Sequence, residues 1–242
     1  MTLAGIVGSA ERIVFFGGAG VSTESGIPDF RSADGLYSAK SGVTHPPEQV
    51  LSHSFFVDHP DEFFAYYKVH LLHPEARPNP AHVGLARLEE RGKLTAVITQ
   101  NIDGLHQAAG SKAVLELHGS VHRNYCLGCG RRYDLAFVVG APGVPLCEDC
   151  GGVVRPDVVL YEEPLDETVL NRAARELAAA DTLIVGGTSL AVYPAAGLLG
   201  LFHGTKLVLI NRDPTPADRL ATLVIRDSVG AAPRVVTGTL SV

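Results

Sequence analysis

Short apolar runs alternate with amphipathic stretches along most of the chain. Six of these runs are five residues long, rich in Val, Ile and Leu, and show little polar alternation, as strands buried on both faces of a sheet do. The predicted strands are 12–16, 95–99, 113–117, 157–161, 182–186 and 206–210. Helix-like segments lie between several of them. This rhythm predicts an α/β fold with a Rossmann-like, doubly wound parallel sheet.

The clearest predicted helix follows Asp166, which is placed to cap its first turn. Its apolar positions recur at helical spacing: Val169, Leu170, Ala173, Ala174 and Leu177. A second helical stretch, "DEFFAYYKVHLL", covers 61–72.

Two segments break the rhythm, and we interpret both as insertions into the nucleotide-binding domain. Residues 34–77 carry Gly, His, Pro and aromatic residues, and residues 121–154 carry all four cysteines. The predicted organisation is a Rossmann-like nucleotide-binding domain, a loop with a helical insertion, and an insertion that carries the cysteines. Their ranges are 1–33 with 78–120 and 155–242, then 34–77, then 121–154.

Composition narrows the class of protein. The 242 residues are 46% hydrophobic and 19% charged, which suits one large domain with smaller insertions. A net charge of −6 argues against a nucleic-acid surface and fits a basic protein or peptide partner better. We find no signal peptide and no apolar stretch long enough for a membrane span, so we expect a cytoplasmic protein without a membrane contact. The oligomeric state is not predicted.

A glycine-rich turn follows the first predicted strand. Gly18-Ala19-Gly20 would let backbone N–H groups approach a pyrophosphate. The glycines alone fit a tight turn without a ligand equally well. The dehydrogenase fingerprint is also incomplete, because Thr23 stands where the third glycine belongs and no acidic residue ends a second strand. Asn211, after the strand 206–210, is a candidate for the ribose contact.

The four cysteines form a C-x2-C-x17-C-x2-C pattern at Cys126, Cys129, Cys147 and Cys150. Four thiolates at this spacing suit tetrahedral zinc. Since every cysteine is used, the predicted zinc is structural; four reduced cysteines without a metal are the alternative.

Polar residues follow two further strands. "TQNIDGLHQAAG" (99–110) and "LHGS" (117–120) each come after an apolar run. Ligands of open α/β sheets bind beyond the carboxyl ends of the strands, so these residues share an edge with the glycine turn. Of the ten histidines, His118 is the best candidate for acid–base chemistry. His106 is expected to cap or pack.

The motifs occur in the order found in sirtuins, the NAD-dependent protein lysine deacylases. "GAGVSTESGIPDFRS", "TQNIDGLHQAAG", "LHGS", the paired cysteines, "GGTSLAVYPAAGL" and "INRDPTP" carry the resemblance. It extends from about residue 12 to about residue 230, and the length resembles a compact prokaryotic member of the family.

The resemblance implies a binding site for NAD, which sirtuins consume as a co-substrate. Ala19, Gly20 and Thr23 would line the pyrophosphate, with Gly18 beside them. Phe30 and Arg31 would belong to the cofactor loop. Ser22, Ile102 and Asp103 would form the nicotinamide pocket beside Asn101, and Gln100 would contact the neighbouring ribose. Gly187, Thr188, Ser189, Asn211, Arg212 and Ser228 would hold the adenosine half.

The chemistry that the resemblance implies explains why a phosphate turn leads into reactive side chains. The nicotinamide–ribose bond breaks, the acyl oxygen of a substrate lysine attacks the ribose carbon, and His118 acts as general base on the ribose hydroxyls. The products are lysine, nicotinamide and O-acyl-ADP-ribose. The partner is an acetyl-lysine protein or peptide that adds as a strand beside "DVVLYEE". Here Glu162 replaces the glycine of the family's common "FGE", and its carboxylate could favour basic residues flanking the lysine.

Acyl preference also follows from the resemblance. Sirtuins that prefer succinyl or malonyl lysine carry a Tyr-x-x-Arg pair, and Phe64 and Tyr67 occupy these positions here. We therefore expect a deacetylase, with activity toward longer apolar acyl groups as an extension. Two other classes stay open: a protein mono-ADP-ribosyltransferase, and a binding module for NAD without catalysis. His118 favours the deacylase over both.

Overall fold

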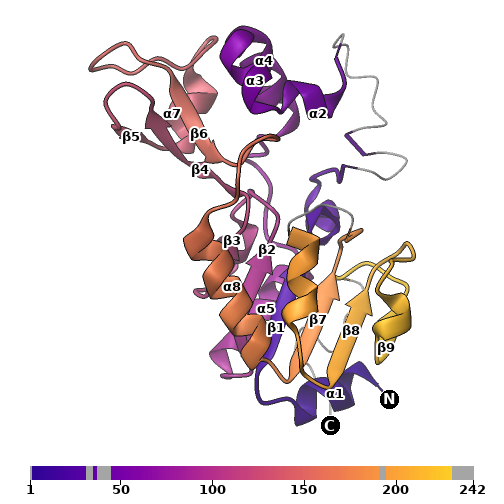
Figure 1. Ribbon diagram of the computed structural model, residues 1–242. Helices are drawn as coiled ribbons and strands as arrows, with labels where there is room; N and C mark the ends of the chain where they lie inside the picture. Colours follow the sequence, from indigo (N-terminus) through magenta and orange to yellow (C-terminus); the bar gives the residue numbers. More distant parts are fainter. Residues whose placement is uncertain (1, 31–34, 37–44, 191–194, 231–242) are drawn as a thin grey trace.

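The structure is a computed structural model that describes residues 2–30, 35–36, 45–190 and 195–230. Figure 1 shows a larger lower part built on a sheet and a smaller upper part of helices and short strands. The predicted contact residue Arg31 lies outside the described residues.

The larger part contains a six-stranded parallel sheet in the order β3-β2-β1-β7-β8-β9. This confirms the predicted doubly wound sheet. Its strands are β1 (Ile13–Gly17), β2 (Leu94–Thr99), β3 (Val114–Glu116), β7 (Thr182–Gly186), β8 (Lys206–Ile210) and β9 (Leu223–Ile225). The short β9 was not predicted.

Alternate residues of β1 face two separate cores. Ile13 and Phe15 pack with α1 and α5, whereas Val14 and Phe16 pack with α8 and the 3-10 helix η3. Because both faces of the strand are covered, the apolar run carries no polar alternation. The helices of this part are α1 (Leu3–Ser9), α5 (Pro80–Glu90), α6 (Leu105–Ala108) and α8 (Glu167–Ala179), with 3-10 helices η1 (Ala19–Val21), η2 (Thr23–Ser25), η3 (Ala195–Leu201) and η4 (Asp218–Leu220).

The helix α8 begins as the sequence predicts. Asp166 Oδ1 accepts hydrogen bonds from the backbone N–H groups of Thr168 and Val169 at 2.7 and 3.0 Å. Ala173 and Leu177 are completely buried against the sheet.

The upper part joins the two insertions around one core. It contains α2 (Pro47–Val50), α3 (His53–Asp58), α4 (Pro60–His70) and α7 (Leu135–Gly140), with a three-stranded antiparallel sheet of β5 (Arg132–Tyr133), β4 (Gly119–Cys126) and β6 (Val154–Val158). Phe56, Phe63 and Phe64 of the helices pack in one cluster with Val121 and Val158 of the sheet. The helix expected over 61–72 is therefore confirmed as α4, in a shared core.

One predicted strand belongs elsewhere. The run 157–161 was expected in the parallel sheet, but β6 spans Val154–Val158 and pairs antiparallel with β4. β6 follows the second cysteine pair and lies beside β4, the strand that leads into the first cysteine pair. An apolar run does not reveal which sheet it joins, so the sequence could not distinguish these outcomes.

Two histidines lie buried between α5 and α6. His82 and His106 are 0% and 1% exposed, and their rings meet edge to face with centroids 4.7 Å apart. His106 packs as expected, and both of its ring nitrogens lack a hydrogen-bond partner among the described residues. Burial lowers the pKa of His82 to about 4 and that of His106 to about 3.

The low pKa values of His82 and His106 predict that the fold becomes less stable in acid. In the unfolded chain they take up protons near pH 6.5, whereas in the fold they stay neutral until about pH 4 and 3. The free energy of unfolding should therefore fall as the pH drops below 6.5, by up to about 1.4 kcal/mol per pH unit for each histidine. Urea unfolding at pH 7, 6 and 5 measures this slope. His106→Leu should make the slope shallower, and a variant that leaves it unchanged would contradict the assignment; exposed His203→Leu is the control.

Candidate active site

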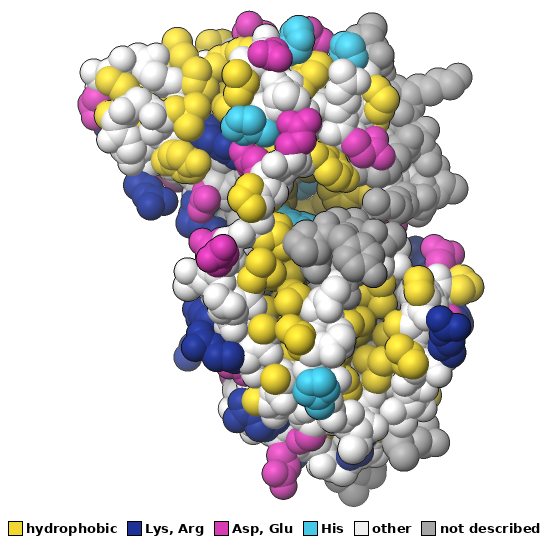
Figure 2. All heavy atoms as spheres, viewed as in Figure 1, with side chains coloured by type: hydrophobic (Ala, Val, Ile, Leu, Met, Phe, Trp, Pro, Cys, Tyr) yellow, Lys and Arg dark blue, Asp and Glu magenta, His cyan; other side chains and the backbone are white. Residues whose placement is uncertain are grey.

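One cavity collects the predicted residues. It lies at the carboxyl ends of the parallel strands, between the two parts of the molecule. His118 and every predicted NAD contact in the described part of the chain line it: Gly18, Ala19, Gly20, Ser22, Thr23, Phe30, Gln100, Asn101, Ile102, Asp103, Gly187, Thr188, Ser189, Asn211, Arg212 and Ser228. Figure 2 shows hydrophobic side chains gathered in the hollow between the upper and lower parts.

The glycines of the first turn permit a close approach of two backbones. Gly20 N donates to Gly187 O at 2.9 Å, and a Cβ at Gly20 would stand 2.8 Å from Gly187 Cα. Gly187 itself has φ +58°, a conformation that favours glycine. The turn after β1 therefore lies directly against the turn after β7, and together they form one side of the cavity.

A polar cluster joins the turn after β1 to the segment after β2. Ser22 is 1% exposed, and its hydroxyl donates to Asp103 Oδ2 at 2.6 Å while accepting from Asn101 Nδ2 at 3.1 Å. Asp103 Oδ1 accepts from Leu105 N at 2.9 Å, at the start of α6. These bonds fix the carboxylate, the amide and the hydroxyl relative to one another.

His118 follows β3 and is held in one tautomer. Its Nδ1 lies 2.9 Å from the backbone oxygen of Gln100, which can only accept, so Nδ1 carries the proton. The lone pair of the neutral ring is then on Nε2. Burial lowers the pKa of His118, and the bond to Gln100 opposes this shift in part. The ring is consequently a neutral base at neutral pH.

Other predicted contacts are also held in place. Gln100 Nε2 donates to Thr188 Oγ1 at 3.1 Å, which links β2 to the turn after β7. Asn211 N donates to Ile225 O at 3.0 Å, and its side-chain amide donates to Asp213 O. Ser228 Oγ donates to Glu24 Oε1 at 3.1 Å.

The sequence did not predict the apolar wall of the cavity. Leu51, Leu71, Val121, Leu135 and Leu160 contribute to it, mostly from the upper part. In the sequence these positions resemble ordinary core residues, and only the packing of the two insertions brings them to the cavity.

The rim between β6 and α8 carries an unusual backbone. Glu162 has φ +76°, although it is not glycine. Its carboxylate accepts hydrogen bonds from Ser54 N at 2.9 Å and Ser54 Oγ at 3.0 Å, at the start of α3. Tyr161 pairs with the same region, donating to Leu51 O and accepting from His53 N, both at 3.0 Å. The side chain of Glu162 is thus engaged within the protein.

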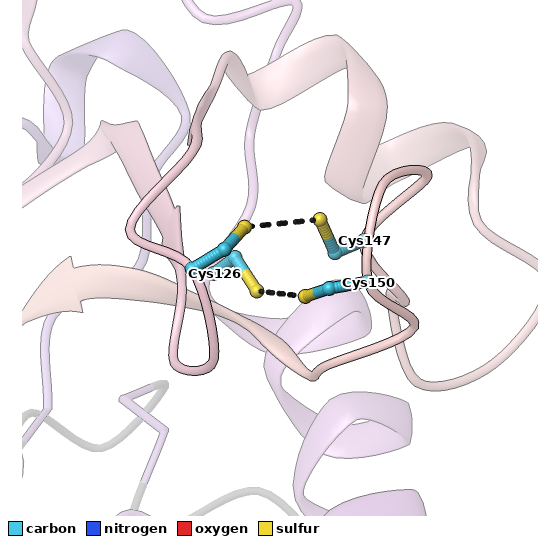
Figure 3. A group of neighbouring side chains, drawn as sticks. Cys126, Cys147 and Cys150 are labelled. Atoms are coloured by element: carbon cyan, nitrogen blue, oxygen red, sulfur yellow. Dashed lines mark hydrogen bonds between the residues drawn. The ribbon is translucent and has the colours of Figure 1, made fainter.

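The four cysteines form a second site, at the end of the small sheet (Figure 3). Their sulfur atoms all lie within 4.8 Å of one another, with Cys126–Cys150 at 3.4 Å and Cys129–Cys147 at 3.6 Å. Tetrahedral zinc with Zn–S bonds of about 2.3 Å separates its sulfur ligands by about 3.8 Å. The arrangement fits a zinc ion with four thiolate ligands and no open position, which is a structural site.

Together, the parallel sheet, the polar cavity at its carboxyl edge and the four-thiolate site define a nucleotide-binding α/β protein with a structural metal site. The Sir2 family model matches residues 18–194. The chain belongs to the Sir2 family, the sirtuins.

Known proteins support this assignment along nearly the whole chain. It is 61% identical over 226 residues to an NAD-dependent protein deacetylase of Clostridium perfringens, covering 93% of each chain. It is 58% identical to one of Cutibacterium acnes, covering 94% of this chain and 93% of the other. A Sir2 variant solved with a deacetylated p53 peptide and 3′-O-acetyl ADP ribose superposes with a TM-score of 0.88 at 41% identity, over 98% of this chain and 96% of that one. A Sir2 homologue in complex with NAD gives 0.87 at 37% identity, over 98% and 92%.

Zinc loss should destabilise the fold. Cys126 is 1% exposed and belongs to a small cluster with Cys147 and Val154, so Cys126→Ala removes both a ligand and core packing. We expect a loss on the order of several kcal/mol and a clearly lower melting temperature. Leu127→Ala, at an exposed neighbouring position, is the control. Protein purified without zinc that melts at the normal temperature would contradict a structural metal.

Proposed function

We propose that this chain is an NAD-dependent protein lysine deacetylase that releases nicotinamide and O-acetyl-ADP-ribose. The observation that carries the proposal is the fixed tautomer of His118 on the cavity wall, since a ring that donates from Nδ1 to Gln100 presents Nε2 as a base. A chain that only binds NAD has no use for such a base. The relatives named NAD-dependent protein deacetylase support the same conclusion.

The polar groups divide the cavity into regions for the parts of NAD. Ser22, Asn101 and Asp103, with Ile102, are assigned to nicotinamide, since a hydroxyl, an amide and a carboxylate suit a carboxamide. The turn at 18–20 with Thr23 is assigned to the pyrophosphate, and Gln100 to the neighbouring ribose. Thr188, Ser189, Asn211, Arg212 and Ser228, beside Gly187, are assigned to the adenosine half.

When bound, NAD would supply the ribose carbon that the acyl oxygen of the substrate lysine attacks, with nicotinamide as the leaving group. The chain's own residues then act on that centre. His118 Nε2 would accept a proton from a ribose hydroxyl of bound NAD, with the ring oriented by the hydrogen bond from Nδ1 to Gln100 O. Phe30, which packs against the core of the upper part, is assigned to exclude water from the reacting carbon. The acetyl-lysine peptide is assigned to the rim at 159–163.

We retain the expectation that the carboxylate of Glu162 favours basic residues flanking the lysine. Its two hydrogen bonds from Ser54 fix its position at the rim and leave its negative charge in place. We also assign Glu162 to shaping the rim. Among the described residues, no helix combines the length and apolarity needed to cross a bilayer. We retain a cytoplasmic location as part of the proposal.

His118→Tyr tests the function directly. The wild type, given NAD and an acetyl-lysine peptide, should yield nicotinamide, O-acetyl-ADP-ribose and free lysine by mass. The variant should keep its melting temperature and bind NAD, yet lose at least 100-fold in deacetylation because the base is missing. His203→Tyr, on an exposed histidine, is the matched control. Deacetylation at a near wild-type rate would reject His118 as the base, and ADP-ribosylated protein as the main product would favour the transferase.

The described residues of α4 offer no free cation for a second carboxylate. Arg77, which follows α4 and lines the cavity, has a mostly exposed side chain that lies 3.9 Å from the carboxylate of Glu75. Tyr67 lines the cavity, and Phe64 is buried beside it. Lys68 Nζ donates to Ala141 O and Gly143 O at 2.5 and 2.7 Å, so its ammonium is engaged in the upper part. Burial, with neighbouring His73, lowers the pKa of His70, so that ring is neutral at neutral pH.

We therefore predict a preference for acetyl over succinyl lysine. Burying a succinyl carboxylate without a cation should cost about several kcal/mol. We therefore expect kcat/KM for the succinyl peptide to be at least tenfold below that for the acetyl peptide. The kcat/KM values of acetyl, butyryl and succinyl peptides with the same sequence measure this preference. Tyr67→Arg should recover part of the succinyl activity, with exposed Val69→Arg on the same helix as control. A tenfold preference for succinyl in the wild type would contradict the assigned pocket.

A further inference from the structure

Asn79, which no motif assigned, caps α5 and also contacts the turn that carries Ser22. It is 6% exposed, and its Oδ1 accepts from Ala81 N at 2.9 Å as the cap of α5. The side-chain amide donates in the other direction, to Val21 O at 2.8 Å and to Ser25 Oγ at 3.0 Å. Capping alone needs only an acceptor, which Asp or Ser supplies equally well. The donor half of Asn79 therefore serves a different contact.

That contact holds both sides of the segment containing Ser22. Val21 ends η1 and Ser25 ends η2, and each of these 3-10 helices has three residues. Such short helices have little stability of their own. Ser25 N also donates to Ser22 O at 2.9 Å. Asn79 thus fixes the two ends of the segment from which Ser22 Oγ reaches Asp103.

The same helix supports Asp103 from the other side. His82 Nδ1 accepts from Asn79 N at 3.2 Å, and the His82 ring packs on His106. His106 belongs to α6, whose first backbone N–H, on Leu105, donates to Asp103. Both partners of the Ser22–Asp103 hydrogen bond are therefore backed by the first turn of α5.

We propose that Asn79 is a positioning residue for the nicotinamide end of the cavity, holding Ser22 at hydrogen-bond distance from Asp103. The inference rests on the proposed assignment of these two residues to nicotinamide. Removing only the donor should weaken binding of NAD and of free nicotinamide. It should weaken binding of ADP-ribose, which lacks nicotinamide and shares only the contact to Thr23 in this segment, much less than binding of NAD, and leave the acetylated peptide unaffected.

Asn79→Asp isolates this role, because the carboxylate keeps the cap and loses the donor toward Val21 O. We expect the KM for NAD and the inhibition constant of nicotinamide each to rise at least fivefold, with the KM for peptide and the Kd for ADP-ribose within twofold of wild type. Ser25→Ala, which removes one of the two contacts, should shift the same constants in the same direction by less. If Asn79→Asp folds poorly, Ser25→Ala alone tests whether this contact affects nicotinamide binding.

Asp166→Ala is the control for stability alone, because it removes a helix cap of α8 outside the cavity. It should lower the melting temperature without changing the NAD constants. The proposal is overturned if the Asn79 and Ser25 variants only melt earlier, as this control does, or if binding of ADP-ribose and NAD weakens equally. A wild type that does not deacetylate would instead reject the proposed function, and titration of NAD against ADP-ribose would still report on Asn79.

Discussion

The contact between the turn after β1 and the turn after β7 is the constraint on which the cavity depends. Gly20 and Gly187 meet backbone to backbone at the centre of the sheet, where β1 and β7 are neighbours. Any side chain at either position would push the turns apart. With them together, Thr188 comes within reach of Gln100, and the Gln100 carbonyl in turn orients His118. One steric requirement thus connects the dinucleotide edge of the sheet to the catalytic base.

In the upper part, two segments far apart in sequence pack together and form one wall of the cavity. They share a core of aromatic and aliphatic side chains, and a buried ion pair joins them to the rim. Arg155 of β6 is 7% exposed and donates to both carboxylate oxygens of Glu163, at 2.7 and 3.1 Å. The guanidinium also lies over the Phe56 ring of α3 at 5.4 Å. Breaking this pair would leave a buried charge without a partner, so the loss of either residue should destabilise the wall.

Much of this was predictable from the sequence, for physical reasons that differ between elements. The strands β7 and β8 match the prediction residue for residue, because burial on both faces selects continuous Val, Ile and Leu. Gln100, Asn101, Asp103 and His118 were found because parallel strands present their carboxyl ends at one edge. Thr188, Ser189 and Ser228 followed only from the resemblance to sirtuins. The sheet to which β6 belongs could not be predicted, since pairing is a long-range choice. The hydrogen-bond partners of Lys68 and Asn79 could not be predicted either. The sequence shows that these side chains can donate, but it does not show which distant carbonyl oxygen accepts.

Glu162 holds a backbone conformation that favours glycine. A left-handed backbone at a residue with a Cβ costs about 1 to 2 kcal/mol, and the two hydrogen bonds to Ser54 offset that cost. Glu162 is tolerable because Ser54 binds its carboxylate, whereas glycine at position 162 would need no partner. Among relatives, the two positions should therefore change together, so that an acidic residue at one is accompanied by a hydroxyl at the other. A rim conformation suited to glycine is thus held by a residue with a side chain, because its carboxylate is bound by Ser54.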